Sequence, residues 1–319
     1  MRHWLVPLTA ALLLVSMQPI TAAMFRQGVI QNFADLATSD CHNPEGITAD
    51  TTGTLYAAGL SGNICVVDGT GTVTRVIPVA SGNALLGELY VDGQIYVADN
   101  NGDFSGGRVT RVDVATGKVH VVARGFANTN AFERDASGTL YVSDSFAGAV
   151  YTVNPKNGAK AIWAQSDKLL KSHGFPGFGA NGLAFDSDRS FLYVANTGDD
   201  LILRIAVNPD GSAGPVTVFA DGAAIDAAQG TTGALNGADG IVFDRSGRLW
   251  VCANQANEIQ VLSQDGTTLV ARYGGSGDDA MRFPASPVFV GKAMFVTNLY
   301  FGTPGAGKLS ALGAAPGAP

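Results

Sequence analysis

The chain has 319 residues, of which 46% are hydrophobic and 15% are charged, and its formal net charge is -7. This length can bury a large core, and it fits either two average domains or one all-β domain built from repeats. The negative balance argues against nucleic acid as a partner and does not by itself suggest any other partner.

The first 23 residues have the composition of a secretory signal peptide. A basic start at residues 1–3 precedes an apolar run over residues 4–15, and small residues at 21–23 supply a cleavage site. The apolar run is short for a membrane span, and an uncleaved N-terminal anchor is the alternative. We therefore expect a mature chain that begins near Met24, is exported to the periplasm or the medium, and has no membrane span.

The rest of the chain repeats one pattern six times. An apolar strand is followed by a tight turn rich in Asp and Gly, which provide side-chain capping and positive φ, and then by a strand of the type Leu-Tyr-Val-Ala-Asn. The second strands are expected at residues 55–58, 95–99, 140–144, 192–196, 249–253 and 294–298. A third and an outer strand follow in most copies. Four strands in each repeated unit predict an all-β, six-bladed β-propeller over residues 24–313.

The two ends of the repeat indicate how the ring closes. The sixth unit ends at residues 308–312 without an outer strand, whereas residues 28–36 form a strand of the outer type ahead of the first unit. We expect residues 28–36 to complete the last blade, because closure removes the exposed edges of an open sheet. A large β-sandwich is the alternative. Residues 167–172 are the only stretch expected to form a helical turn, and residues 314–319 are expected to be a flexible tail.

The cysteines are three in number, Cys41, Cys65 and Cys252. In an oxidising compartment, an odd count is explained most simply by one disulfide and one buried thiol. The sequence leaves the pairing open, and Cys41–Cys65 is one possibility. No spacing typical of a Cys or His metal site occurs.

Four of the repeats place an oxygen-bearing side chain at the start of the first strand, five residues before an aspartate. These residues are Glu45, Asn130, Asn181 and Asp239, while Gly87 and Ser286 are expected at this position in the other two repeats. The innermost strands of a propeller line its central channel, so the four side chains should converge. Two carboxylates and two amides suit a hard divalent cation, calcium first. For any single residue, capping of the local backbone is the alternative.

Three of these motifs resemble the metal-site motifs of the gluconolactonase/regucalcin (senescence marker protein) family of six-bladed propellers. They are Pro44-Glu45-Gly46, Asn181 to Asp186 and Asp239-Gly240-Ile241, and Asn130 falls where the family has an Asn that opens the third blade. The resemblance implies that Glu45, Asn181 and Asp239 bind the metal. It also implies that Asn130 is a ligand or a substrate contact, and that Asp239 is the catalytic base or nucleophile. One divalent cation is implied, Ca²⁺ first, with Zn²⁺, Mn²⁺ or Mg²⁺ as alternatives.

The candidate substrate contacts lie on loops near the same positions. The family's substrate-binding arginine is replaced here by Asn128, which argues against a sugar lactone. Further candidates are His42 and His173 as a second acid or base, and Phe175, Phe178, Phe104 and Phe146 as apolar walls. An apolar rim favours an aryl or alkyl lactone over a polyol.

The expected activity is cation-assisted hydrolysis of a lactone or related ester by a monomeric protein. A bound cation polarises the carbonyl, stabilises the oxyanion and acidifies a water, which Asp239 or a histidine deprotonates. One alternative is a non-catalytic propeller that binds a partner or ligand. Two others are a phosphotriesterase with the same metal site and a condensing enzyme of the strictosidine synthase type, which lacks the metal cage.

Overall fold

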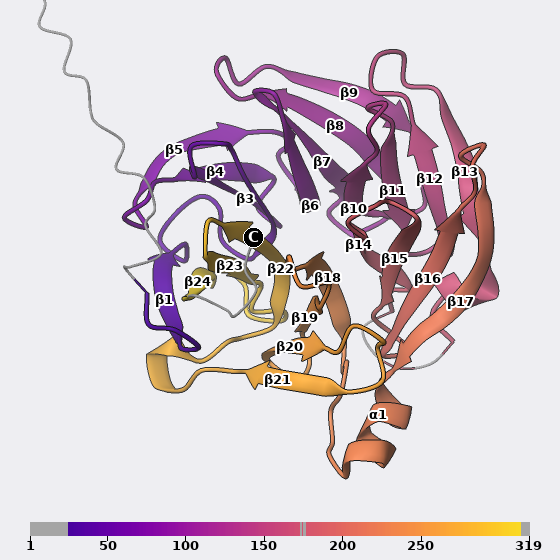
Figure 1. Cartoon of the computed structure of the whole chain (residues 1–319). Coiled ribbons are helices and arrows are strands. Elements are labelled where there is room, and N and C mark those ends of the chain that lie inside the picture. Colours follow the sequence, from indigo (N-terminus) through magenta and orange to yellow (C-terminus); the bar gives the residue numbers. More distant parts are fainter. Residues whose placement is uncertain (1–24, 173, 175–176, 314–319) are drawn as a thin grey trace, which may run out of the picture.

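The computed structural model describes residues 25–172, 174 and 177–313. In this part of the chain, six four-stranded antiparallel sheets form a ring (Figure 1). This arrangement is the six-bladed β-propeller that the repeats predicted, and each sheet is one blade. The predicted signal peptide and the predicted tail lie outside the described residues.

The strands of each blade follow one another from the centre of the ring outwards. The innermost strands are β2 (Pro44–Ala49), β6 (Asn83–Val91), β10 (Thr129–Arg134), β14 (Ala180–Phe185), β18 (Ala238–Phe243) and β22 (Pro284–Val290). The second strands are β3 (Leu55–Gly59), β7 (Gln94–Asn101), β11 (Leu140–Asp144), β15 (Phe191–Asn196), β19 (Leu249–Ala253) and β23 (Ala293–Asn298).

The two outer layers complete the blades. The third strands are β4 (Asn63–Val67), β8 (Arg108–Asp113), β12 (Ala149–Val153), β16 (Leu201–Val207), β20 (Glu258–Leu262) and β24 (Lys308–Leu312). The outermost strands are β5 (Val73–Pro78), β9 (Val119–Arg124), β13 (Lys160–Gln165), β17 (Ala213–Asp221), β21 (Leu269–Tyr273) and β1 (Ile30–Asp35). We number the blades 1 to 6 from the one that begins with β2.

The last blade joins both ends of the described chain. Strand β1 pairs antiparallel with β24, with Ile30 opposite Leu312 and Asp35 opposite Lys308. The N-terminal strand therefore closes the ring as predicted. Strand β1 covers the outer edge of β24, so blade 6 has four strands like the other blades and contains both ends of the described chain.

The hydrophobic core lies between neighbouring blades. Second strands such as β11 and β19 are buried along their whole length, because both of their faces pack against other blades. Trp250 of blade 5 is 1% exposed and packs edge to face on Phe289 of blade 6 with ring centroids 5.8 Å apart. Burial of large apolar side chains stabilises each by about 1.5–3 kcal/mol, so the interfaces between blades hold the inner strands in place.

Helical structure is confined to short segments of the described chain. The predicted turn is present as a 3₁₀ helix, Asp167–Leu169, and a second one spans Gly277–Asp279. Helix α1 (Gly222–Gln229) was not predicted. Its signals are nevertheless in the sequence, since Asp221 caps its first turn and Gly230 ends it in the left-handed conformation. None of the described helices is long and apolar enough to span a membrane.

One of the possible cysteine pairings is formed. Cys41 and Cys65 make a disulfide with their Cα atoms 5.8 Å apart, and Cys252 is a buried free thiol. The bridge ties the segment before β2 to the third strand of blade 1.

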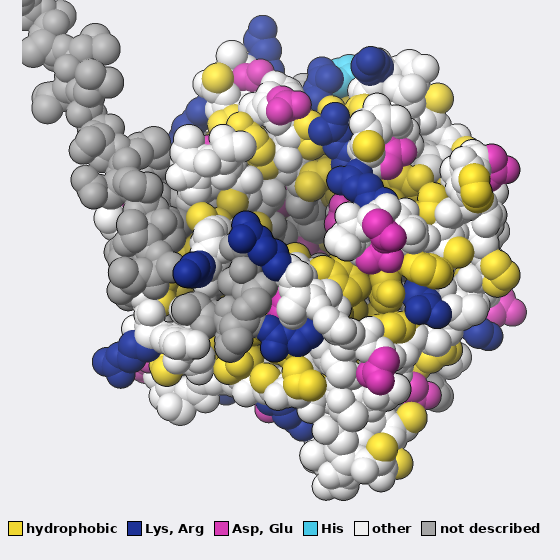
Figure 2. Space-filling model, in the orientation of Figure 1, with side chains coloured by type: hydrophobic (Ala, Val, Ile, Leu, Met, Phe, Trp, Pro, Cys, Tyr) yellow, Lys and Arg dark blue, Asp and Glu magenta, His cyan; other side chains and the backbone are white. Residues whose placement is uncertain are grey.

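The face of the ring seen in Figure 1 is hollowed near its centre in the space-filling view (Figure 2).

Candidate active site

The candidate ligands lie in bulges of the innermost strands. In blade 4, Ala180 pairs with Asn196 and Leu183 pairs with Val194, so Asn181 falls inside a register shift. The same kind of shift occurs near the start of the innermost strand in all six blades. A bulge breaks the pairing locally and turns a side chain in a new direction. Here it turns these side chains toward the mouth of the channel.

The glycines after three of the ligands allow the inner strands to lie close together. A Cβ atom on Gly182 would stand 2.3 Å from the Asp239 carbonyl oxygen, and one on Gly46 would stand 2.4 Å from the Leu86 oxygen. Only a residue without a side chain fits such an approach. The Glu-Gly, Asn-Gly and Asp-Gly dipeptides of the sequence motifs therefore have a packing cause as well as a chemical one.

The register of the sheets corrects two positions. The equivalents of Asn181 are Leu86 in blade 2 and Ala285 in blade 6, because each lies just after the first pair of its shift. The prediction of Gly87 and Ser286 was wrong by one residue. The hairpin turns of these two blades have only two residues, 92–93 and 291–292, so the spacing used for the other blades does not apply.

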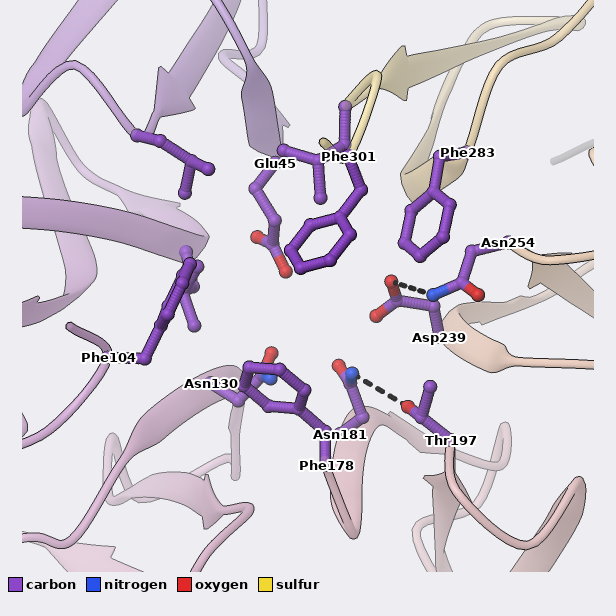
Figure 3. Close-up of a pocket in the computed structure, with 13 residues that line it drawn as sticks. Glu45, Phe104, Asn130, Phe178, Asn181, Thr197, Asp239, Asn254, Phe283 and Phe301 are labelled. Atoms are coloured by element: carbon purple, nitrogen blue, oxygen red, sulfur yellow. Dashed lines mark hydrogen bonds between the residues drawn. The ribbon is translucent and has the colours of Figure 1, made fainter. Parts of the chain in front are cut away.

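The four candidate ligands meet at one cavity. Glu45, Asn130, Asn181 and Asp239 all line it, and their oxygen atoms point toward a common centre (Figure 3). Its volume of about 30 Å³ is enough for an ion with a water molecule. Figure 3 also shows the rings of Phe104, Phe178, Phe283 and Phe301 around the opening. The convergence expected from the sequence is present.

The two carboxylates of the cavity lack the partners that buried charges require. Glu45 and Asp239 are each 4% exposed, and within the described residues Glu45 Oε2 and Asp239 Oδ1 have no hydrogen-bond partner. Burial raises the pKa of Glu45 well above its usual value, and the charges of Asp239 and Glu88 add to this effect. Burial also raises the pKa of Asp239, although the neighbouring Asn254 and Asn181 amides lower it in part. Two such groups favour a bound cation or a bound proton.

Two hydroxyl groups orient the amides of the candidate ligands Asn130 and Asn181. Thr197 Oγ1 donates its proton to the Ala238 carbonyl oxygen at 2.7 Å, so it must accept from Asn181 Nδ2 at 2.9 Å. Ser145 is placed in the same way, between the Ala180 oxygen at 2.6 Å and Asn130 Nδ2 at 3.1 Å. Both bonds leave the amide oxygens to face the cavity.

These hydrogen bonds also connect neighbouring blades. Thr197 of blade 4 bonds the carbonyl of the residue before Asp239, in blade 5. Ser145 of blade 3 bonds the carbonyl of the residue before Asn181, in blade 4. Asn254 completes the series by donating to Asp239 Oδ2 at 3.0 Å. The candidate ligands of blades 3, 4 and 5 are thus connected through a chain of short contacts.

The remaining predicted contacts are placed differently from one another. Phe178 and Phe104 line the cavity, and Phe146 packs on Phe178 with ring centroids 5.3 Å apart. His42 is half-buried outside the lining, with Nδ1 3.2 Å from Asn43 Oδ1. His173 and Phe175 lie outside the described residues.

Asn128 lies behind the cavity wall. It is fully buried and does not belong to the described lining, and its Nδ2 donates to the Phe104 carbonyl oxygen at 2.6 Å. The predicted direct contact between Asn128 and substrate has no support from this placement. Its observed contact holds the loop that carries the Phe104 ring.

Sequence reasoning missed several residues of the cavity. In blades 1, 4, 5 and 6 the first residue of the innermost strand pairs with the last residue of the second strand. The residue directly after that partner lines the cavity in these four blades, as Thr197, Asn254, Leu60 and Leu299. The repeat could have identified this position, since it follows the same strand pattern. Phe283 and Phe301 lie on irregular segments that no repeat marks.

The donor set fits a hard cation of the calcium type. No group of three or more His, Cys, Asp or Glu side chains that could hold a metal occurs among the described residues. Two carboxylates and two amides form a different kind of set, in which every donor is oxygen, as calcium and magnesium prefer. The unpartnered carboxylate oxygens point to the same conclusion.

The chain is similar to known propellers in sequence and in fold. Residues 170–300, which include Asn181 and Asp239, match the family model described as the SMP-30/Gluconolactonase/LRE-like region. This match confirms the resemblance to the gluconolactonase/regucalcin family. No curated protein matches the chain.

Solved structures share the fold over most of their length. A gluconolactonase from Xanthomonas campestris is 20% identical, with a TM-score of 0.65, and the alignment covers 93% of this chain and 94% of that one. The calcium-binding protein regucalcin from Agrobacterium tumefaciens is 19% identical, with a TM-score of 0.63 and coverage of 90% and 96%. A luciferin-regenerating enzyme is 14% identical, with a TM-score of 0.65 and coverage of 89% and 94%.

Proposed function

We propose that this protein is a lactonase-type hydrolase that uses one divalent cation, calcium first. The observation that carries the proposal is the cavity itself, where Glu45 and Asp239 present unpartnered oxygens and Asn130 and Asn181 present oriented amide oxygens. The matched family and two of the similar structures support lactone chemistry and calcium.

The residues of the cavity have different roles in the proposed hydrolysis. Glu45, Asn130, Asn181 and Asp239 would hold a divalent cation, which when bound would stabilise an oxyanion and acidify water. Asp239 is positioned by Asn254 through Oδ2, which leaves Oδ1 to take a proton from the attacking water. The water oxygen adds to the lactone carbonyl carbon, the ring C–O bond breaks, and the proton passes from Asp239 to the leaving oxygen. Direct attack by Asp239 Oδ1 on the carbonyl is the other route open to the same atom.

Export is part of the proposal. The signal-peptide composition of residues 1–23 supports it, and the Cys41–Cys65 disulfide fits an oxidising compartment. We propose that the mature protein works as a monomer on a small molecule in the periplasm or the medium.

The test uses the mature chain with and without metal. We expect about one tightly held divalent ion, turnover of a lactone or aryl ester, and loss of turnover with EDTA that added Ca²⁺ restores. Asp239→Asn should lower kcat by about 10³-fold or more while the melting temperature stays close to that of the wild type. Asp210→Asn, on an exposed turn, is the matched control and should have full activity.

Other outcomes separate the alternatives. Turnover of a phosphotriester in place of lactones would assign the site to phosphotriester hydrolysis. Tight metal binding with no turnover of either class would favour a binding propeller. A metal-free protein with full activity would overturn the proposed mechanism.

A further inference from the structure

The cavity has an oxygen-rich side and an apolar side, and the division follows the blades. At the ligand position, blades 3, 4 and 5 carry Asn130, Asn181 and Asp239, whereas blades 2 and 6 carry Leu86 and Ala285. Glu45 of blade 1 is the single oxygen ligand opposite, between these two apolar neighbours.

The position after the second strand repeats this division. Ser145, Thr197 and Asn254 hold it in blades 3, 4 and 5, while Leu60 and Leu299 hold it in blades 1 and 6. In blade 2 the equivalent residue is Asn100, which lies inside β7 directly after the Leu85–Asp99 pair. Both ends of its amide bond the backbone of Thr129, so the amide is not available to the cavity. Two independent positions of the repeat thus place apolar side chains on the same side.

Four phenyl rings surround the opening, and those of Phe283 and Phe301 continue the apolar side. Phe283 and Phe301 stack with centroids 5.2 Å apart and planes 24° apart, and Phe104 meets Phe178 edge to face at 5.8 Å. All four rings line the cavity, and Figure 3 shows them around its opening.

Two of these rings stand on backbone that is costly for a bulky residue. Phe104 has φ of 65° and Phe283 has φ of 56°, a region that non-glycine residues seldom occupy. Each is held by a side-chain amide: the buried Asn128 donates to the Phe104 oxygen at 2.6 Å, and the half-buried Asn257 accepts from the Phe283 N–H at 2.7 Å. Strained backbone of this kind persists where the surroundings enforce it, commonly at functional sites.

We infer that the site takes a lactone or ester with an apolar alkyl or aryl substituent, bound in one orientation. The reacting carbonyl faces blades 3, 4 and 5, and the substituent lies against Leu86, Leu299 and the rings of Phe283 and Phe301. This inference rests on the proposed hydrolase function. The hydroxyl groups of a sugar lactone would meet leucine and phenylalanine on this side and would lose their hydrogen bonds to water without replacement.

The first test compares substrates. With Ca²⁺ bound, the wild type should hydrolyse an alkyl-substituted δ-lactone with a kcat/KM at least about tenfold above that for a polyhydroxylated δ-lactone, because apolar contacts discriminate by about that factor or more. Equal rates, or a preference for the polyhydroxylated lactone, would overturn the inference.

The second test changes the apolar wall. Leu299→Thr uses the residue that blade 4 already carries at this position, so the scaffold accommodates it. We expect about a tenfold loss of kcat/KM for the alkyl lactone, little change for the polyhydroxylated one, and unchanged Ca²⁺ affinity. Val270→Thr, on an exposed outer strand, is the control. Phe283→Leu tests the same wall without adding a polar atom and should lower only the alkyl-lactone rate. A loss that is equal for both substrates would contradict the inference.

Binding separates this inference from the proposed function. Calorimetry with an alkyl-substituted δ-lactam, which resists hydrolysis, should show tighter binding than a polyhydroxylated lactam, and Leu299→Thr should remove the difference. If no lactone or ester is turned over but the alkyl lactam still binds more tightly, the hydrolase proposal fails and the apolar subsite stands. If neither lactam is preferred, the apolar subsite is wrong whatever the catalytic result.

Discussion

Blades 2 and 4 have the same backbone register and opposite chemistry at two positions. In blade 4, Asn181 faces the cavity and Leu183 packs in the core between blades. In blade 2, the equivalent positions hold Leu86 at the cavity and Glu88 in the buried interface. The comparison shows that the bulge decides where a side chain points, while the residue in it decides whether that blade contributes a ligand.

The largest effect should come from removing a ligand carboxylate. Glu45→Gln keeps the size of the side chain but removes the only charge that the described residues place on its side of the cavity lining. We therefore expect loss of tight Ca²⁺ binding and a fall in kcat of about 10³-fold. Calorimetry with Ca²⁺ and a lactone assay measure both effects. Glu88→Gln is the same chemical change in the next blade, and it should lose far less Ca²⁺ affinity and activity, because Glu88 does not line the cavity. Retention of tight Ca²⁺ binding by Glu45→Gln would remove this residue from the ligand set.

The next largest effect tests whether the Thr197 hydroxyl of blade 4 orients Asn181. Thr197→Val keeps the shape but removes the group that orients Asn181, so Ca²⁺ affinity should fall by about 10–100-fold, as for other residues that orient metal ligands. Thr197→Ser should restore affinity because it keeps the hydroxyl. Thr217→Val is the control, since that hydroxyl also donates to a carbonyl but lies on an exposed strand. A purely structural role would lower the melting temperature without changing Ca²⁺ affinity.

A smaller effect is expected from filling the space between two inner strands. Gly182→Ala places a Cβ atom 2.3 Å from the Asp239 carbonyl oxygen, so β14 and β18 must move apart. We expect a loss of about 2 kcal/mol in the free energy of unfolding, measured by urea denaturation. Gly274→Ala is the control, because its nearest contact would be 3.4 Å. An unchanged stability would show that the two strands separate without cost.

The blades and the convergence of the four candidate ligands could be predicted from sequence because they share a repeated local signal. Strands such as β15 and β19 repeat one apolar pattern, and Asn181 and Asp239 stand at one spacing from a turn aspartate. Leu86 and Ala285 were missed because their hairpins have shorter turns, which changes the number of residues between this position and the turn.

The other omissions have a different cause. Phe283 and Phe301 reach the cavity from irregular segments, and only tertiary contacts place such segments. Helix α1 was missed although Asp221 and Gly230 mark its ends, because eight residues give too little periodicity to recognise.

The smallest effect is expected at Glu88, where the direction of the pH dependence of stability can be tested. Both of its carboxylate oxygens lack a hydrogen-bond partner within the described chain, and the nearby Ala58 N–H offsets only part of the effect of burial on the pKa of Glu88. Burial raises the pKa of Glu88 to about 8. A carboxyl whose pKa is higher in the folded state binds its proton more tightly there, so stability is greatest at low pH and falls as the pH rises from the unfolded pKa toward 8.

Glu88→Gln should therefore flatten this part of the stability profile. The amide carries no charge at any pH in the window, so the variant should be more stable than the wild type near pH 8, by about 1 kcal/mol or more, and the difference should shrink toward pH 5. Urea denaturation at both pH values measures it, with Asp92→Asn on the exposed adjoining turn as control. Metal at the cavity should reduce the difference, because a cation beside Glu45 also favours the charged form of Glu88. If the stability advantage of Glu88→Gln instead grew toward acid pH, Glu88 would have to be charged and paired in the folded protein. Glu88 would then differ from Leu183 of blade 4 without being a destabilising buried carboxyl.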